Sequence, residues 1–292
     1  MIRCEGLTKS YEGDGIADLT LSVLPGEALG LLGPGGAGKS LTLRVLMGQI
    51  RADAGTAEIA GNDCWKKRRE VQKKVAYAPA SPVLEEEATG ENYLRFVGRF
   101  RGGFNPKKAR DFAQRLDVGL TGSCRRMSPE NRKKLSLLAA FSLDRDVLLL
   151  DEPSVGLGSL ARSALLDAVA SAREAGCAVL MTFHALEEAR RFSSHVAIIR
   201  KGRLVLNQPV SSLSQTRQKV YHVTFATAQE AARFAAEWEA GVELFGSRAM
   251  VAIPASPQVL LKTLARYDVS DLVGGRDEGE EGFLRFYGDD IV

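Results

Sequence analysis

The sequence predicts an α/β fold with buried strands, followed by a smaller α+β domain. Short apolar runs alternate with amphipathic stretches such as residues 161–174, and a glycine-rich segment joins one of these runs to a helix-like one. The apolar runs are residues 19–23, 28–32, 75–78, 147–150, 178–182 and 196–199. With 292 residues, 45% of them hydrophobic, the chain has enough apolar material for one large core and a small one.

Turn signals separate the strand-like runs near the N-terminus. Pro25-Gly26 and Ala60-Gly61-Asn62 each lie beside a strand-like run, so we expect two hairpins there and an antiparallel β subdomain. A third turn, Lys201-Gly202-Arg203, lies between two further strand-like runs.

Two other regions have patterns of their own. Between about residues 84 and 142 the strands give way to helical periodicity, over 88–100, 106–116 and 131–143, which predicts an inserted helical subdomain. From residue 214 onward the pattern restarts as a βαββαβ unit, over 220–225, 228–239, 242–245, 248–253, 257–267 and 269–273. We therefore expect a large domain at 1–213 and a small one at 214–292. Residues 274–282 have the composition of an exposed acidic loop.

Composition excludes several classes of protein. The net charge of +3 is too balanced for nucleic-acid binding by electrostatics alone. The basic stretches 66–69 and 73–74 are typical of solvated faces, or alternatively of a face near anionic lipid, so no nucleic-acid partner is expected. The chain shows no signal-peptide core and no uncharged apolar run of about 18 residues, which predicts a cytoplasmic protein. Four widely spaced cysteines predict buried small hydrophobes rather than disulfides or a zinc site.

The glycine-rich segment matches the pattern GxxxxGK[ST], and Leu41 begins the helix-like run after it. Its residues are Gly33, Pro34, Gly35, Gly36, Ala37, Gly38, Lys39 and Ser40. Glycines let successive backbone N–H groups turn onto phosphate oxygens, and the helix N-terminus adds positive potential. Lys39 can then reach the terminal phosphates and Ser40 can ligate Mg²⁺. The segment therefore predicts a site for a nucleoside triphosphate.

Polar residues at the ends of other runs complete this candidate site. Asp151 and Glu152 follow a buried run, where they can hold Mg²⁺ and activate a water molecule; an ordinary acidic turn is the alternative. His184 follows the next run and can bond a γ-phosphate or that water, although lone histidines are usually structural. Tyr11 ends the first strand, where its ring can stack on a purine or pack in the core.

These residues, in this order and spacing, resemble the nucleotide-binding subunit of ATP-binding cassette (ABC) transporters over about residues 1–213. Tyr11 resembles the family's adenine-stacking aromatic residue, Asp151-Glu152 its Walker B box and His184 its switch histidine. Residues 89–94 resemble a segment common in exporters of drugs, antibiotics and lipids. The resemblance implies an ATPase that uses ATP and Mg²⁺, in a dimer that sandwiches two ATP molecules head to tail. It also implies an integral membrane permease as partner, which would hold the chain at the inner face of the membrane.

Residues 127–131, which read Met-Ser-Pro-Glu-Asn, stand where the family has its signature LSGGQ. Ser128 can still cap a helix and touch a γ-phosphate bound by the other subunit. Pro129 removes one N–H donor, and Glu130 places a carboxylate where a helix N-terminus should attract an anion. We expect these changes to weaken a phosphate contact across the dimer.

Two more positions depart from the family pattern. The Q-loop glutamine is replaced by Ala80, which removes a side chain that would contact Mg²⁺ or the attacking water. The D-loop aspartate is replaced by Gly158, which removes a contact across the two sites. Family drift is one interpretation, and an asymmetric pair of sites is the other.

Two functional hypotheses follow. The first is an ATPase subunit that powers an exporter, with one or both sites of the dimer impaired. The second is an ATP-dependent switch or clamp with little hydrolysis. The small C-terminal domain carries no motif and is expected to stabilise a dimer or regulate it.

Overall fold

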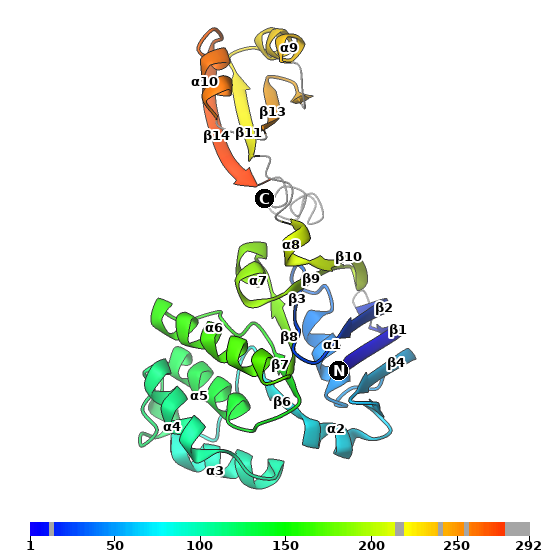
Figure 1. Cartoon of the computed structure of the whole chain (residues 1–292), viewed down its shortest axis with the longest axis vertical. Coiled ribbons are helices and arrows are strands. Elements are labelled where there is room, and N and C mark those ends of the chain that lie inside the picture. Colours follow the sequence, from blue (N-terminus) through cyan, green and yellow to red (C-terminus); the bar gives the residue numbers. More distant parts are fainter. Residues whose placement is uncertain (12–14, 214–218, 239–241, 254–256, 278–292) are drawn as a thin grey trace. The chain divides into compact units, whose positions relative to one another are not determined.

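The computed structural model describes residues 1–11, 15–213, 219–238, 242–253 and 257–277 (Figure 1). By its internal contacts the chain divides into two compact units, Met1–Val210 and Ser211–Val292, and each is described by itself. Within the described ranges, no helix has both the length and the apolar character needed to cross a membrane.

The first unit contains two sheets. A four-stranded antiparallel sheet has the order β2-β1-β4-β5, from β1 (Ile2–Ser10), β2 (Gly15–Val23), β4 (Ala54–Ile59) and β5 (Asn62–Asp63). A six-stranded sheet has the order β10-β9-β3-β8-β7-β6, from β3 (Ala28–Leu32), β6 (Val75–Ala78), β7 (Val147–Leu150), β8 (Ala178–Phe183), β9 (His195–Arg200) and β10 (Arg203–Pro209). Only β10 runs antiparallel to its neighbour in the larger sheet. The predicted α/β class and N-terminal antiparallel subdomain are confirmed.

One predicted hairpin is wrong. Pro25-Gly26 leads from β2 into β3, and these strands belong to different sheets. A β-turn signal specifies only a reversal or bend of the backbone, so it cannot say which strands then pair. The second prediction is right, because Ala60-Gly61 joins β4 to β5 in register, Ile59 opposite Asn62.

Helices surround the larger sheet and form the predicted helical insertion. Their bounds are α1 (Lys39–Leu46), α2 (Arg68–Lys74), α3 (Gly90–Arg101), α4 (Pro106–Leu116), α5 (Pro129–Phe141), α6 (Ser159–Glu174) and α7 (Leu186–Phe192). A short helix, α8 (Val210–Leu213), begins at the last residue of the first unit. Helices α3, α4 and α5 begin at side-chain caps, from Thr89, Asn105 and Ser128 respectively. Because a capping oxygen satisfies N–H groups that the first turn leaves free, each helix begins at its cap.

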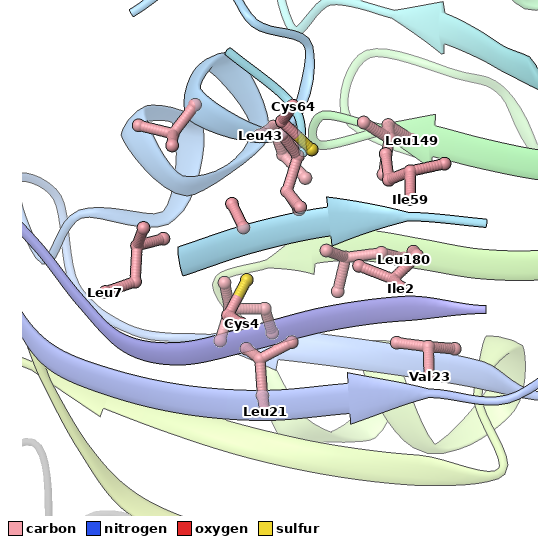
Figure 2. Packing of buried hydrophobic residues seen from close by; sticks show 14 of the residues in the cluster. Ile2, Cys4, Leu7, Leu21, Val23, Leu43, Ile59, Cys64, Leu149 and Leu180 are labelled. Carbon is pink, nitrogen blue, oxygen red and sulfur yellow. The ribbon is translucent and has the colours of Figure 1, made fainter. Parts of the chain in front are cut away.

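A hydrophobic cluster joins the antiparallel sheet to α1 and the parallel sheet (Figure 2). Figure 2 labels Ile2 and Val23 of the first sheet, Leu180 of the second and Leu43 of α1 among the members of this cluster. The four cysteines are buried, as predicted for small hydrophobic residues. Burial raises the pKa of the Cys4 thiol to about 12. This core fixes α1, and with it the loop that precedes α1.

The second unit is one antiparallel sheet covered by two helices. Its elements are β11 (Lys219–Phe225), α9 (Ala228–Glu237), β12 (Val242–Phe245), β13 (Arg248–Ile253), α10 (Gln258–Leu264) and β14 (Val269–Asp277), with strand order β12-β13-β11-β14. Phe234 of α9 and Leu260 of α10 pack in one core with Val223 and Val251 of the central strands. The predicted βαββαβ pattern is confirmed. The expected acidic loop is wrong for 274–277, which continue β14, and 278–282 lie outside the described residues.

Candidate functional site

The glycine-rich loop lies between β3 and α1, where its backbone is held close to other strands. A Cβ atom at Gly33 would lie 2.4 Å from the carbonyl oxygen of Ile199, so no side chain fits there. Gly38 has a φ of +101° and precedes the first turn of α1, a conformation that favours glycine. By contrast, a Cβ at Gly35 would meet nothing within 4 Å, so the loop has an open side toward which a ligand can approach. The loop is therefore preshaped by the fold.

Lys39 is the buried charged residue of this loop. Its Nζ donates to the carbonyl oxygens of Gly33 at 2.5 Å and Pro34 at 3.0 Å, and lies 3.4 Å from Nδ1 of His184. Burial lowers the pKa of the Lys39 ammonium, while the negative charges of Glu152 and Asp151 oppose that shift. The ammonium is thus held by carbonyl oxygens that phosphate oxygens can replace.

Asp151 joins the loop to two neighbouring strands. Its Oδ1 accepts a hydrogen bond from Oγ of Ser40 at 3.1 Å and from Oγ1 of Thr182 at 2.6 Å. Thr182 Oγ1 in turn accepts from the backbone N–H of Glu152 at 2.8 Å. Thr182, buried at the end of β8, therefore orients both carboxylate residues at the end of β7. Sequence reasoning noted the strand that contains Thr182 but gave the hydroxyl no role.

Glu152 and His184 form a pair at the same edge of the sheet. Glu152 Oε1 lies 2.6 Å from Nε2 of His184. The backbone of Glu152 has a φ of +46°, which an L-residue adopts only at a cost of order 1 kcal/mol or more. Such strain is retained where the surroundings determine the conformation, and here the hydrogen bond from its N–H to Thr182 does so.

Tyr11 borders the same hollow from the end of β1. A cavity of about 300 Å³ is lined by Tyr11, residues 34–41 of the loop, Arg44, Glu152 and His184. The Tyr11 side chain is exposed, with Nζ of Lys9 5.3 Å from its ring centre, so the alternative of core packing is wrong. Every residue predicted to hold nucleotide thus lines one cavity, except Gly33, the first residue of the loop, whose carbonyl oxygen accepts from Nζ of Lys39.

Ser40 and Asp151 have the chemistry that Mg²⁺ requires. A hydroxyl and a carboxylate oxygen, 3.1 Å apart, are hard donors, and Mg²⁺ at phosphate sites takes one or two protein ligands. The donor set therefore fits the ion.

The signature-like residues lie around a different hollow. Pro129 and Glu130 line a cavity of about 560 Å³ together with Ala80, Val155 and others. Ser128 caps α5, accepting from the N–H of Asn131 at 3.2 Å. A single chain does not bring these residues into the cavity lined by the phosphate loop.

Lys133 links helix α5 to the ends of β6 and β7 by hydrogen bonds. No role was expected for this residue from the sequence. Its Nζ donates to the carbonyl oxygens of Pro79 and Ala80, both at 3.0 Å, and of Asp151 at 2.9 Å. The residue is 4% exposed, and burial lowers the pKa of its ammonium to about 8, against the opposing charges of Asp151 and Glu152. Lys133 lies four residues before the buried Leu137, so the two residues share one face of α5. This helical spacing is the feature of the sequence from which burial of Lys133 could have been predicted.

Comparison with known proteins agrees with this geometry. Residues 16–155 match the family described as ABC transporter. The chain is 33% identical to the daunorubicin/doxorubicin resistance ATP-binding protein DrrA of Streptomyces peucetius, over 74% of this chain and 67% of that protein. It is 33% identical to Nod factor export ATP-binding protein I of Paraburkholderia xenovorans, over 73% and 72% respectively. A solved ATP binding subunit of an ABC transporter, 26% identical, matches with a TM-score of 0.69 over 74% of this chain and 92% of that one.

A strand, a phosphate loop and a helix, with paired carboxylates at the end of β7, the second strand across the sheet from β3, define a P-loop ATPase. This chain belongs to the ABC transporter family, as an ATP-binding subunit.

Proposed function

We propose that the chain binds and hydrolyses Mg-ATP in a head-to-tail dimer and so powers export by a separate permease subunit. One observation carries this proposal: Ser40, Asp151, Thr182, Glu152 and His184 form a continuous hydrogen-bonded series beside the phosphate loop. Export is supported by the similarity to a drug-resistance ATP-binding protein and to a Nod factor export ATP-binding protein. Binding to the permease would place the chain at the inner face of the membrane.

The side chains of this series would divide the chemistry among them. Lys39 would exchange its carbonyl partners for the terminal phosphates, which lie within reach of the same loop. Glu152 would accept the proton of the attacking water, and His184, bonded to its carboxylate, would keep that carboxylate oriented. Mg²⁺, when held by Ser40 and Asp151, would neutralise charge that develops on the phosphate oxygens.

The dimer is expected to complete each site. Pro129 and Glu130 line a hollow apart from the phosphate cavity, and Ser128 caps the same helix, so a second subunit would bring its own signature helix to the nucleotide. With Ala80, Pro129 and Glu130 in place of the family residues, we propose that one or both sites turn over slowly.

The test is steady-state Mg-ATPase activity of the purified chain, alone and with the membrane protein that co-purifies with it. We expect turnover that rises with the partner and falls about a hundredfold or more in Glu152→Gln, because the proton acceptor is lost. Glu70→Gln, which changes an exposed carboxylate on α2, is the matched control.

A second candidate is a switch that binds ATP and hydrolyses little, and the three departures from the family pattern favour it. If Glu152→Gln leaves cellular activity unchanged while Lys39→Ala abolishes it, the switch is correct. Loss of activity in both variants supports hydrolysis coupled to export.

A further inference from the structure

Two of the positions that depart from the family pattern contact each other. Glu130 lies in the first turn of α5, and Gly158 is the residue immediately before α6. Oε1 of Glu130 accepts a hydrogen bond from the backbone N–H of Gly158 at 3.1 Å. The same oxygen lies 3.1 Å from Nζ of Lys134, one turn further along α5. One carboxylate oxygen of Glu130 thus contacts both the backbone N–H of Gly158 and the ammonium of Lys134.

The Glu130 carboxylate is not used to cap its own helix. Ser128 already accepts from the N–H of Asn131 in that first turn. Helix α6, in contrast, begins at Ser159, and Gly158 at its N-cap position supplies no side-chain cap. Glu130 therefore gives a charged acceptor to a backbone N–H at the start of another helix, and charged acceptors form the stronger hydrogen bonds.

Steric need does not explain the glycine at 158. A Cβ atom there would lie 3.5 Å from Oε1 of Glu130, which is ordinary contact, and the residue has a φ of −67°. What the contact requires of position 158 is its N–H group. An aspartate there would bring a second carboxylate close to Glu130, and like charges at that range repel.

We infer that Glu130 is a positioning residue that fastens loop 155–158 to the first turn of α5, with Lys134 holding its carboxylate in place. The inference rests on the proposed function, in which the first turn of α5 meets the nucleotide of the other subunit and the loop before α6 lies at the contact between the two sites. Fastened together, they meet the partner as one unit although the family's aspartate and glycine are absent. The carboxylate, expected from the sequence to repel a phosphate, is here shared between an N–H group and an ammonium.

Electrostatics agree with this arrangement. The Gly158 N–H first, and Lys134 second, hold the pKa of the Glu130 carboxyl below its usual value. The group is therefore ionised at neutral pH, as the contact needs.

The first measurement is hydrogen exchange of residues 157–160 in the full-length chain. We expect Glu130→Ala to raise the exchange rate of the Gly158 amide about fivefold, because one hydrogen bond of ordinary strength is lost. Glu130→Gln, which keeps an acceptor oxygen, should restore part of the protection. Glu70→Ala removes a comparable exposed carboxylate paired with Lys73 on α2 and serves as the control. Unchanged exchange in Glu130→Ala, or an equal rise in Glu70→Ala, would overturn the inference.

The second measurement is a double-mutant cycle on ATP turnover. Gly158→Pro removes the N–H and keeps a φ that proline adopts, while Gly158→Ala keeps the N–H and adds only the Cβ. We expect Glu130→Ala and Gly158→Pro each to lower kcat about fivefold, and the double variant to lower it no further. Affinity of the monomeric chain for Mg-ADP should stay within about twofold, since neither residue lines the phosphate cavity. Additive effects of the two changes would contradict a shared contact.

The two measurements separate this inference from the proposed function. If the wild-type chain shows no turnover in any preparation, the proposed function fails, and hydrogen exchange alone then decides whether the contact exists. If turnover is present and exchange is unaffected by Glu130→Ala, the proposed function stands and the positioning role falls.

Discussion

The ends of β7 and β8 and the start of α5 differ in how they organise their polar groups. At the strand ends most bonds join two side chains, Ser40 and Thr182 to Asp151 and His184 to Glu152, and one joins Thr182 to the Glu152 N–H. At α5 most bonds join a side chain to backbone, Lys133 to three carbonyl oxygens and Glu130 to an N–H, and one ion pair joins Glu130 to Lys134. The first region has the residues that the family pattern leads one to expect, and the second lacks several of them. A region that departs from the family motif can therefore still be well organised by hydrogen bonds. Backbone N–H and C=O groups are present in any sequence and can take the place of missing side-chain partners.

The largest effect on ATP hydrolysis is expected from loss of the Thr182 hydroxyl, which contacts both Asp151 and Glu152. Thr182→Val keeps the volume and removes the hydroxyl, so Asp151 loses a donor and the Glu152 N–H loses its acceptor. We expect kcat of Mg-ATP hydrolysis to fall about a hundredfold, as when a preorganised polar group is removed from an active site. Thr224→Val, at a partly exposed position in β11, is the control in the same assay. A loss below about threefold would show that Thr182 does not orient the carboxylates.

A substitution of Lys133 tests how much the side-chain bonds of α5 to backbone groups stabilise the fold. Lys133→Met keeps the length of the side chain and leaves three carbonyl oxygens without their donor. We expect the free energy of unfolding to fall by about 2 kcal/mol, measured by urea denaturation, because buried acceptors lose their hydrogen bonds. Lys73→Met, at an exposed lysine of α2, should cost less than about 0.5 kcal/mol. Equal stability of the two variants would mean that water replaces the Lys133 ammonium.

Ser128 is expected to matter less than Lys133. Ser128→Ala removes the acceptor for the Asn131 N–H at the start of α5 and should lower the free energy of unfolding by about 1 kcal/mol. Ser128→Asp restores a capping oxygen and should recover most of that stability. Thermal denaturation of Ser128→Ala that matches wild type would show that the Ser128 hydroxyl does not stabilise the first turn of α5.

The smallest effect is expected from restoring a family residue. Ala80 binds Lys133 through its carbonyl oxygen, which Ala80→Gln leaves in place while adding the missing side chain. We expect kcat to rise by about threefold, the worth of roughly one weak hydrogen bond in the transition state. Ala80→Leu, of similar size and without polar atoms, is the matched variant. A rise in both would point to packing in the hollow beside Ala80 rather than to contact with the attacking water.

Most of the phosphate site could be predicted because its residues are close in sequence. Residues 33–40 form the loop within one short segment, and the acidic pair and His184 each end a strand-like run. Parallel strands bring their carboxyl ends to one edge, so residues at those ends meet. The role of Thr182 could not be predicted, because nothing in a strand pattern says which hydroxyl points toward a neighbouring carboxylate.

The second region was harder to predict for a physical reason. A lysine beside a signature-like segment is usually solvated, and only the packing of α5 against β6 shows that Lys133 is buried. Glu130 and Gly158 are 28 residues apart, and their contact depends on where two helices begin. Pro25-Gly26 failed as a hairpin signal for the same reason, since pairing of strands is a long-range property.

The sequence by itself determined the α/β class, the βαββαβ unit, the phosphate loop and the polar residues at the strand ends. These follow from periodicity, turn chemistry and local spacing, which act over a few residues. The tertiary structure decided which groups bond to which: Thr182 to the carboxylate residues, Lys133 to the strand ends and Glu130 to Gly158. Those contacts need buried backbone groups to find partners, and only the packed chain fixes which partner is near.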